Sequence, residues 1–135
     1  MKTVLYAEDD PDDVFFFQRA FKKVAPAGSL FVVENGAQAI AYLAGKNPFL
    51  DRAAHPLPNL VLLDINMPVS NGFEVLAWIR AQPELSHLPV VVLTSSNNDA
   101  DRSRATALGA NGYLVKPGQP DGLADLLLAC QQYWI

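Results

Sequence analysis

The stretch that determines the fold is Leu60-Val61-Leu62-Leu63-Asp64-Ile65-Asn66-Met67-Pro68, followed at a short distance by Gly72. Four apolar residues in a row are typical of a strand buried on both faces, and Asp64 follows where the apolar run ends. Ligands of open α/β sheets bind beyond the carboxyl ends of the strands, so a carboxylate at this point faces a crevice. The alternative is that Asp64 only ends the strand and caps a turn, before the helix that Asn71-Gly72 begins.

The composition indicates a compact globular chain and excludes several classes of partner. The 135 residues are 50% hydrophobic and 18% charged, enough to bury a core, so we expect one domain over residues 1–135. The net charge of -4 and the absence of a run of basic residues argue against direct binding to nucleic acid. Cys130 has no partner for an internal disulfide, and no apolar run is long enough for a signal peptide or a bilayer span. We therefore expect a cytoplasmic protein without a membrane partner.

Strand and helix patterns alternate along the chain. Apolar segments predict five strands, at residues 3–7, 30–33, 60–63, 90–93 and 113–115. Helical patterns follow each of them, the first beginning at Pro11 with Asp10 as its N-cap. This α/β alternation is typical of a parallel sheet covered by helices on both faces. Three prolines between Lys46 and Asn59 predict a long surface loop, in which we expect His55 to be solvated.

Polar residues follow four of the five predicted strands. They are Glu8-Asp9-Asp10 after the first, Asp64 after the third, Thr94 after the fourth and Lys116-Pro117 after the fifth. Parallel strands end at a common edge, so we expect these groups to converge. Two like charges 4 Å apart cost about 4 kcal/mol at an effective dielectric near 20, so such a cluster needs a cation or raised pKa values. Oxygen ligands without His or Cys favour Mg²⁺ or Mn²⁺. The alternative is that each residue is an ordinary loop residue or helix cap.

Taken together, the motifs resemble the receiver domain of two-component response regulators, of the single-domain kind typified by the chemotaxis response regulator. The matching motifs are Tyr6-Ala7-Glu8-Asp9, Asp64-Ile65-Asn66-Met67-Pro68 with Gly72, Leu93-Thr94-Ser95, and Tyr113-Leu114-Val115-Lys116-Pro117. The resemblance covers nearly all of the chain. It implies a flavodoxin-like (CheY-like), doubly wound sheet of five parallel strands in the order 2-1-3-4-5, with five helices. It also implies Mg²⁺-dependent phosphorylation by a sensor histidine kinase or a phosphotransfer protein, in a protein that catalyses only its own phosphorylation and dephosphorylation.

The resemblance assigns roles to individual residues. Asp64 would be the nucleophile and phosphoacceptor, and Asp9, Asp64 and the backbone carbonyl of Asn66 would hold Mg²⁺, with Mn²⁺ as the alternative ion. Glu8 would act mainly through metal-bound water, whereas Asp10, one place beyond the usual acidic pair, would be a helix cap first and a site residue second. Lys116 and Thr94 would bind phosphoryl oxygens.

The same resemblance implies a conformational switch. Tyr113 would turn inward when Thr94 moves towards the phosphoryl group, and this would change the face formed by the fourth helix, the fifth strand and the fifth helix. The alternative is that Tyr113 is an ordinary half-buried tyrosine of the strand, without a role in switching. The Lys116–Pro117 peptide bond is expected to be cis.

Three features are similar to the small response regulators paired with bacterial phytochromes. They are the acidic segment from Glu8 to Asp13, the long loop before residue 60 and the aromatic ending Tyr133-Trp134. Such relatives often form homodimers through the last helix, and an exposed aromatic end would suit that contact. The alternative is that Trp134 packs back onto its own domain.

Three other functions compete with the receiver interpretation. A phosphohydrolase with an aspartyl nucleophile would normally carry a second Asp two residues after the nucleophile, where this chain has Asn66. A flavin-binding module would need a phosphate-cradling loop after the first strand, where this chain is acidic. A pure interaction module would not accept phosphate at Asp64 in a metal-dependent reaction.

Overall fold

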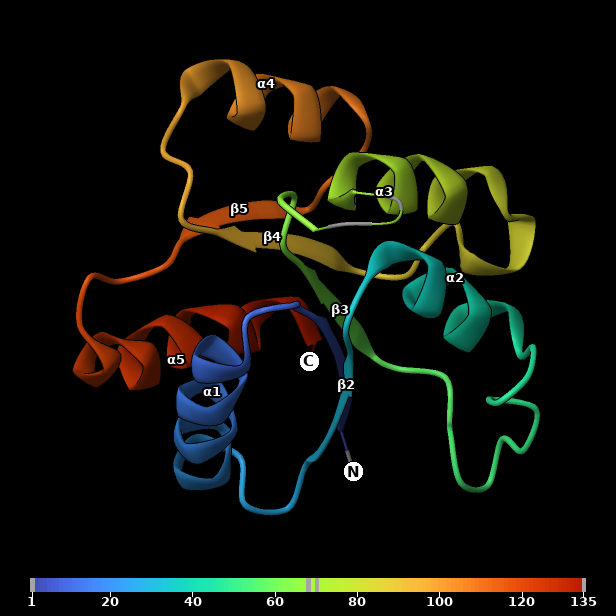
Figure 1. Ribbon diagram of the computed structural model, residues 1–135, viewed down its shortest axis with the longest axis horizontal. Helices are drawn as coiled ribbons and strands as arrows, with labels where there is room; N and C mark the ends of the chain where they lie inside the picture. The colour runs from blue at the N-terminus through green and yellow to red at the C-terminus, as the bar shows by residue number, and fades with distance from the viewer. Residues whose placement is uncertain (1, 68, 70, 135) are drawn as a thin grey trace.

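The structure, a computed structural model, describes residues 2–67, 69 and 71–134, without the side chains of Pro120 and Trp134. Its centre is one parallel sheet with the strand order β2-β1-β3-β4-β5, which confirms the order that the resemblance to receiver domains implies (Figure 1). The strands are β1 (Thr3–Ala7), β2 (Ser29–Val33), β3 (Leu60–Leu63), β4 (Val90–Thr94) and β5 (Gly112–Val115). Every residue of β1, β3 and β4 is buried, which is what a strand covered on both faces requires.

Helices connect the strands and begin where the sequence supplies caps. They are α1 (Pro11–Val24), α2 (Gly36–Ala44), α3 (Gly72–Ala81), α4 (Asp99–Ala107) and α5 (Leu123–Trp134), with short 3₁₀ turns η1 (Pro83–Leu85) and η2 (Pro120–Gly122). The carboxylate of Asp10 accepts hydrogen bonds from the backbone of the first turn of α1, which confirms it as the N-cap. Asn71 and Glu74 form a reciprocal capping box at the start of α3.

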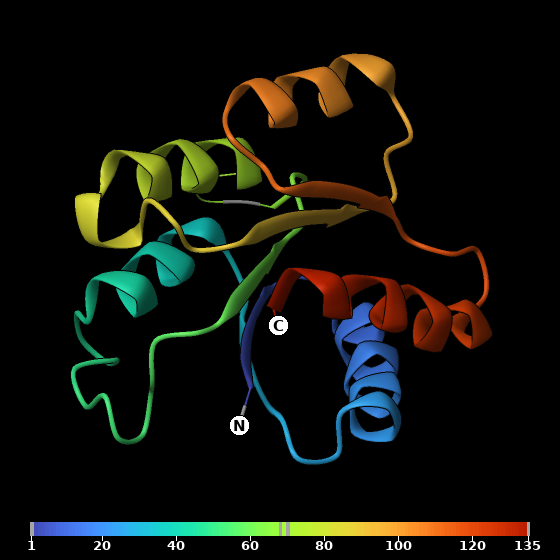
Figure 2. The ribbon, with the colours of Figure 1, turned by 180° about the vertical axis from the view of Figure 1, so that it is seen from behind.

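The two faces of the sheet carry separate hydrophobic cores because side chains alternate along each strand. In β1, Val4 and Tyr6 pack against α1 and α5, whereas Leu5 and Ala7 pack against α2 and α3. Both ribbon views show α1 and α5 together on one side of the sheet and α2, α3 and α4 on the other (Figures 1 and 2). The chain is therefore a three-layer sandwich whose strand exits share one edge.

The loop between α2 and β3 is anchored to the domain. The guanidinium of Arg52 donates hydrogen bonds to the carbonyl oxygens of Tyr42, Leu43 and His55, so it caps the end of α2. The His55 ring lies against an aromatic cluster, and its Nδ1 is buried without a hydrogen-bond partner. The expectation of a solvated His55 is wrong, because the rings of Phe31, Tyr42 and Phe49 offer an apolar surface that the loop covers.

Two further expectations concern the end of the chain and membranes. The position of the Trp134 side chain lies outside the described residues, as does the structure of Ile135. Among the described helices, none combines the length and the apolar character needed to cross a bilayer.

Gly72 is required by the close approach of α3 to the Asp64 strand. A Cβ atom on Gly72 would lie 2.5 Å from the carbonyl oxygen of Asp64 and 2.8 Å from Cα of Ile65, both backbone atoms. We expect Gly72→Ala to lower the free energy of unfolding by about 1–3 kcal/mol, because the strand exit or α3 must shift. Chemical denaturation measures this.

The matched control is Gly118→Ala, because a Cβ on Gly118 would meet nothing within 4 Å. The free energy of unfolding of this variant should lie within about 0.5 kcal/mol of that of the wild type. Equal stabilities for the two variants would contradict the close packing at Gly72.

Cys130 provides a probe of the core between the sheet and α5. It is fully buried, and burial raises the pKa of its thiol to about 12. An exposed thiol is largely ionised at a pH of about 9, so alkylation by iodoacetamide should be fast in denaturant and slower by a factor on the order of 10³ or more in the native protein. Mass spectrometry of timed samples measures both rates, and comparable rates would show that the thiol is not enclosed.

Candidate functional site

Backbone hydrogen bonds continue beyond the strands and fix the residues that leave them. These bonds run from the Glu8 N–H to the Val33 carbonyl (3.0 Å), from the Asp64 N–H to the Ala7 carbonyl (3.2 Å) and from the Lys116 N–H to the Thr94 carbonyl (2.7 Å). Since all five strands are parallel, the residues after them lie at the same edge of the sheet. The structure thus places Glu8, Asp64, Thr94 and Lys116 at one edge.

The ammonium group of Lys116 is the centre of this edge. Its Nζ lies 2.9 Å from Oδ2 of Asp64 and 2.8 Å from Oδ2 of Asp13, and it also donates a hydrogen bond to Oε1 of Glu8. An ammonium has three N–H donors, so three carboxylates satisfy it completely. Burial by itself would lower the pKa of Lys116, but hydrogen bonds to these carboxylates raise it above its ordinary value. Lys116 therefore stays charged.

Glu8 is a carboxylate within the core. Its side chain is almost fully buried and accepts hydrogen bonds from the Tyr6 hydroxyl (3.2 Å), the Asp10 backbone N–H (3.2 Å) and Lys116. Burial raises the pKa of Glu8 to about 7, although Lys116 acts in the opposite direction. Burial and the nearby Glu8 charge raise the pKa of Tyr6 far above its ordinary value, so its hydroxyl remains a donor.

Three carboxylates could hold a divalent cation. Glu8, Asp9 and Asp64 each offer an oxygen, and these oxygens lie within 4.8 Å of one another. Oδ1 of Asp64 also accepts a hydrogen bond from the backbone N–H of Asn66 (2.9 Å), which orients the carboxylate. A set of oxygen donors with no nitrogen or sulfur fits a hard cation such as Mg²⁺. Asp9 is exposed, so solvent reaches this side of the cluster.

Thr94, at the end of β4, and Tyr113, in β5, are linked through Ser96. The Thr94 side chain is fully buried, and its Oγ1 accepts a hydrogen bond from the Ser96 N–H (3.3 Å). The Tyr113 hydroxyl donates to the Ser96 carbonyl (2.9 Å), and the Arg102 guanidinium stacks 4.6 Å from the Tyr113 ring centre. Tyr113 is therefore inward, with 9% of its surface exposed. The loop that follows β4 connects the two residues.

Sequence reasoning missed two contacts in this cluster. Asp13 was named only as the end of the acidic segment that begins at Glu8, yet its carboxylate binds Lys116. The available signal was its place in the first helical turn, directly after the acidic strand exit. Tyr6 was predicted only as part of an apolar strand, but alternation along the strand puts its hydroxyl on the same side as Glu8 two residues later.

The expected cis bond between Lys116 and Pro117 is wrong. Among the described residues, the cis peptide bond is Asn47–Pro48. The preference of an X-Pro bond for trans is only about 0.5–1 kcal/mol, so the surrounding structure decides which isomer is present.

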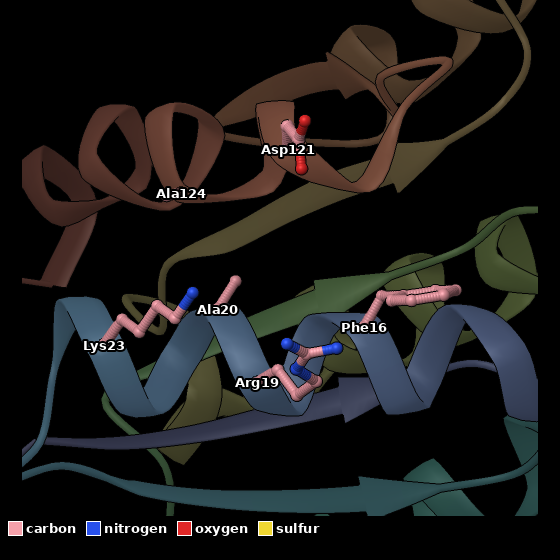
Figure 3. Close-up of a pocket in the computed structure, with 6 residues that line it drawn as sticks. All are labelled: Phe16, Arg19, Ala20, Lys23, Asp121 and Ala124. Atoms are coloured by element: carbon pink, nitrogen blue, oxygen red, sulfur yellow. The ribbon is translucent and has the colours of Figure 1, made fainter.

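Two of the hollows that border α1 share the side chain of Phe16. The smaller, about 160 Å³, borders the cluster and is lined by Asp13, Lys116, Tyr6 and Phe16, among others. The larger, about 350 Å³, lies between α1 and the start of α5 (Figure 3). Arg19 and Lys23 of α1 and Asp121 of η2 line it, together with Phe16, Ala20 and Ala124. It shares Phe16 with the smaller hollow but none of the carboxylates that bind Lys116, so it is separate from the candidate site.

Known proteins are similar to this chain over nearly its whole length. The chain is 34% identical over 134 residues to the response regulator Rcp1 of Synechocystis sp. (strain ATCC 27184 / PCC 6803 / Kazusa), covering 99% of this chain and 89% of Rcp1. A crystal structure of the Mn²⁺-bound form of Rcp1 matches with a TM-score of 0.87, covering 99% of this chain and 94% of the other.

Two phytochrome-related structures are also similar. The response regulator RPA3017, described in red light signalling of R. palustris, has a TM-score of 0.92 and 32% identity, covering 100% of this chain and 94% of that one. The phosphorylated cyanobacterial phytochrome response regulator RcpA has a TM-score of 0.89 and 32% identity, covering 98% and 93%. The family model of the response regulator receiver domain matches residues 4–128. The chain therefore belongs to the response regulator receiver family.

Proposed function

We propose that residues 1–135 act as one receiver domain that accepts a phosphoryl group on Asp64 and thereby switches its α4–β5–α5 face for partner binding. The observation that carries this proposal is the contact of 2.9 Å between Oδ2 of the buried Asp64 and the Lys116 ammonium. It puts a nucleophilic carboxylate beside a fixed positive charge, at an edge that also carries two further acids. The names of the similar proteins Rcp1, RPA3017 and RcpA agree with a signalling role.

Phosphoryl transfer at this edge depends mainly on positioning. An Asp64 oxygen forms a bond to phosphorus while the bond between phosphorus and the donor breaks, and the leaving group departs with the bonding electron pair. For a phosphohistidine donor that bond is P–N, and for acetyl phosphate it is P–O. The Asn66 N–H orients the Asp64 carboxylate through Oδ1, and Lys116 neutralises charge on the transferred oxygens.

We assign the divalent ion to Glu8, Asp9, Asp64 and the backbone carbonyl of Asn66, with Glu8 acting mainly through a bound water. Mg²⁺ is the proposed ion and Mn²⁺ is the alternative, supported by the carboxylate cluster and by the Mn²⁺-bound form of the relative Rcp1. When bound, the ion would neutralise charge on the transferred group and on the carboxylates.

The proposed switch begins at Thr94 and ends at the surface of α4. A phosphoryl group on Asp64 would offer acceptor oxygens to the Thr94 hydroxyl and to Lys116, and charge-assisted hydrogen bonds contribute about 1.5–3 kcal/mol each. Moving a population from 1:99 to 99:1 takes about 5.5 kcal/mol, so two such bonds supply much of the shift. Tyr113 is already inward in this structure, so phosphorylation would bias an existing equilibrium.

The partners we propose are a sensor histidine kinase, of the phytochrome type, or a phosphotransfer protein, in the cytoplasm. The likeness to phytochrome response regulators supports this choice. The proposed activity is limited to phosphorylation and dephosphorylation of the chain itself. We also propose a homodimer through α5, whose Leu128 is 53% exposed.

Phosphate labelling tests the proposal. We expect acetyl phosphate to add one phosphoryl group to the wild type in the presence of Mg²⁺, and much less in EDTA, because charge on the transferred oxygens is then left uncompensated. Asp64→Asn should not be labelled, since a carboxamide is a poor nucleophile. Intact-mass spectrometry gives the readout.

Asp51→Asn is the matched control, because Asp51 is an exposed loop residue whose side chain accepts a hydrogen bond from the Ala53 N–H in its own turn. It should be labelled like the wild type. Equal labelling of wild type and Asp64→Asn would defeat the assignment, and metal-independent labelling would remove the role given to the ion.

Sedimentation with and without beryllofluoride tests the dimer. We expect beryllofluoride to increase the fraction with twice the chain mass and Leu128→Glu to prevent this, because a buried charge without a partner is costly. Leu57→Glu is the control, since Leu57 is 50% exposed on the distant α2–β3 loop. A monomer in every condition, or equal effects of both variants, would contradict a dimer through α5.

A further inference from the structure

The ion pair between Asp13 and Lys116 has no role in the function described so far. It joins α1 to the exit of β5 at 2.8 Å, and it uses one of the three donors of the ammonium. We propose that Asp13 is a positioning residue for phosphoryl transfer, which holds the Lys116 ammonium against Asp64. This inference rests on the proposed role of Asp64 as phosphoacceptor.

Lys116 needs more than one anchor to be placed accurately. A lysine ammonium ends a flexible four-carbon stem, and a single partner would let it swing. Glu8 approaches it from the residue after β1 and Asp13 from α1, so together they fix its position and leave the third N–H for Asp64. The side chain of Lys116 is only 12% exposed, so water offers few competing partners.

Asp13 is itself held in place. Its backbone N–H lies 3.5 Å from Oδ1 of Asp10, which also accepts a hydrogen bond of 2.9 Å from the Asp12 N–H and so caps α1. The Asp13 side chain is 41% exposed, so its ion pair contributes modestly to overall stability, yet enough for a double-variant comparison to detect. The ion pair matters because it fixes the position of the Lys116 ammonium, and a misplacement of about 1 Å can slow a reaction by about 100-fold.

The arrangement also fits the phosphorylated state. When an Asp64 oxygen bonds to phosphorus and the donor leaves with its electron pair, the negative charge moves onto the phosphoryl oxygens. Lys116 then needs to change the acceptor of only one of its hydrogen bonds, from the Asp64 carboxylate to a phosphoryl oxygen. Asp13 and Glu8 can keep the other two.

A charge effect would act in the opposite direction. If Asp13 mattered only as a negative charge, its removal would lower the electrostatic repulsion of an anionic phosphodonor and so speed phosphorylation. Asp12 separates the two effects, because it lies in the same turn, is exposed and makes no ion pair with Lys116. Asp13→Asn adds a second comparison, since its amide oxygen can still accept from Lys116.

Rate measurements with acetyl phosphate and saturating Mg²⁺ give the first test. We expect Asp13→Ala to lower the maximal rate constant by about 10-fold or more, with a smaller change in the donor concentration at half-maximal rate. Asp12→Ala should stay near the wild type, and Asp13→Asn should lie between the wild type and Asp13→Ala. An Asp13→Ala rate equal to or above that of Asp12→Ala, or an Asp13→Asn rate at or below that of Asp13→Ala, would overturn the inference.

Thermal unfolding without metal or phosphodonor gives the second test. The shifts in midpoint temperature caused by Asp13→Ala and Lys116→Met should be non-additive in the double variant, because both remove the same contact. Asp12→Ala and Lys116→Met should be additive, and additivity in both pairs would overturn the inference. If the wild type accepts no phosphoryl group, the proposed function fails together with this inference. If the wild type is labelled and only the Asp13 comparisons fail, the proposed function stands.

Discussion

The ammonium of Lys116, held among the carboxylates of Glu8, Asp13 and Asp64, is the interaction on which the site depends. Two unscreened carboxylates about 4 Å apart repel by about 4 kcal/mol at an effective dielectric near 20, and burial adds a desolvation cost. A central cation offsets the repulsion, which allows Glu8 and Asp64 to stay at the core boundary. The lysine thus stabilises the charges it would later use, and its triple hydrogen bonding keeps it at the reacting carboxylate.

The fold brings these groups together through features that act far from the charges. Parallel pairing of β1 with β3 and of β4 with β5 sends their exits to one edge. Gly72 lets α3 lie directly on the Asp64–Ile65 backbone, so the strand exit is supported from one side. Asp10 caps α1 and thereby fixes the turn that carries Asp13. Positions that never touch phosphate therefore determine where Asp64 and Lys116 meet.

Patterns local in sequence predicted the strands and the helix starts, because apolar runs and capping residues act over short distances, whereas the strand order was implied by the resemblance to receiver domains. They did not predict the Asp13–Lys116 pair, which spans 103 positions and depends on how α1 is tilted over the sheet. The prediction of a solvated His55 was wrong for a similar reason. A proline-rich loop is expected to be exposed to solvent, and the sequence does not show that the His55 ring packs against Tyr42 and Phe49. The isomer of the Lys116–Pro117 bond was also not predicted, because the local free-energy difference between cis and trans X-Pro bonds is small and the surrounding structure decides between them.

The weakest packing of the domain lies where the proposed switch ends. Helix α4 is largely polar, and Ala105 is its one buried residue among those described. Its other contacts with the domain include two arginines stacked on aromatic rings, Arg102 on Tyr113 and Arg104 on Phe73. Cation–π contacts contribute only about 0.5–2 kcal/mol each, so a helix held this way can shift at little cost. Because Tyr113 both supports Arg102 and bonds to the Ser96 carbonyl near Thr94, the proposed switch would reach α4 from Thr94 through one side chain.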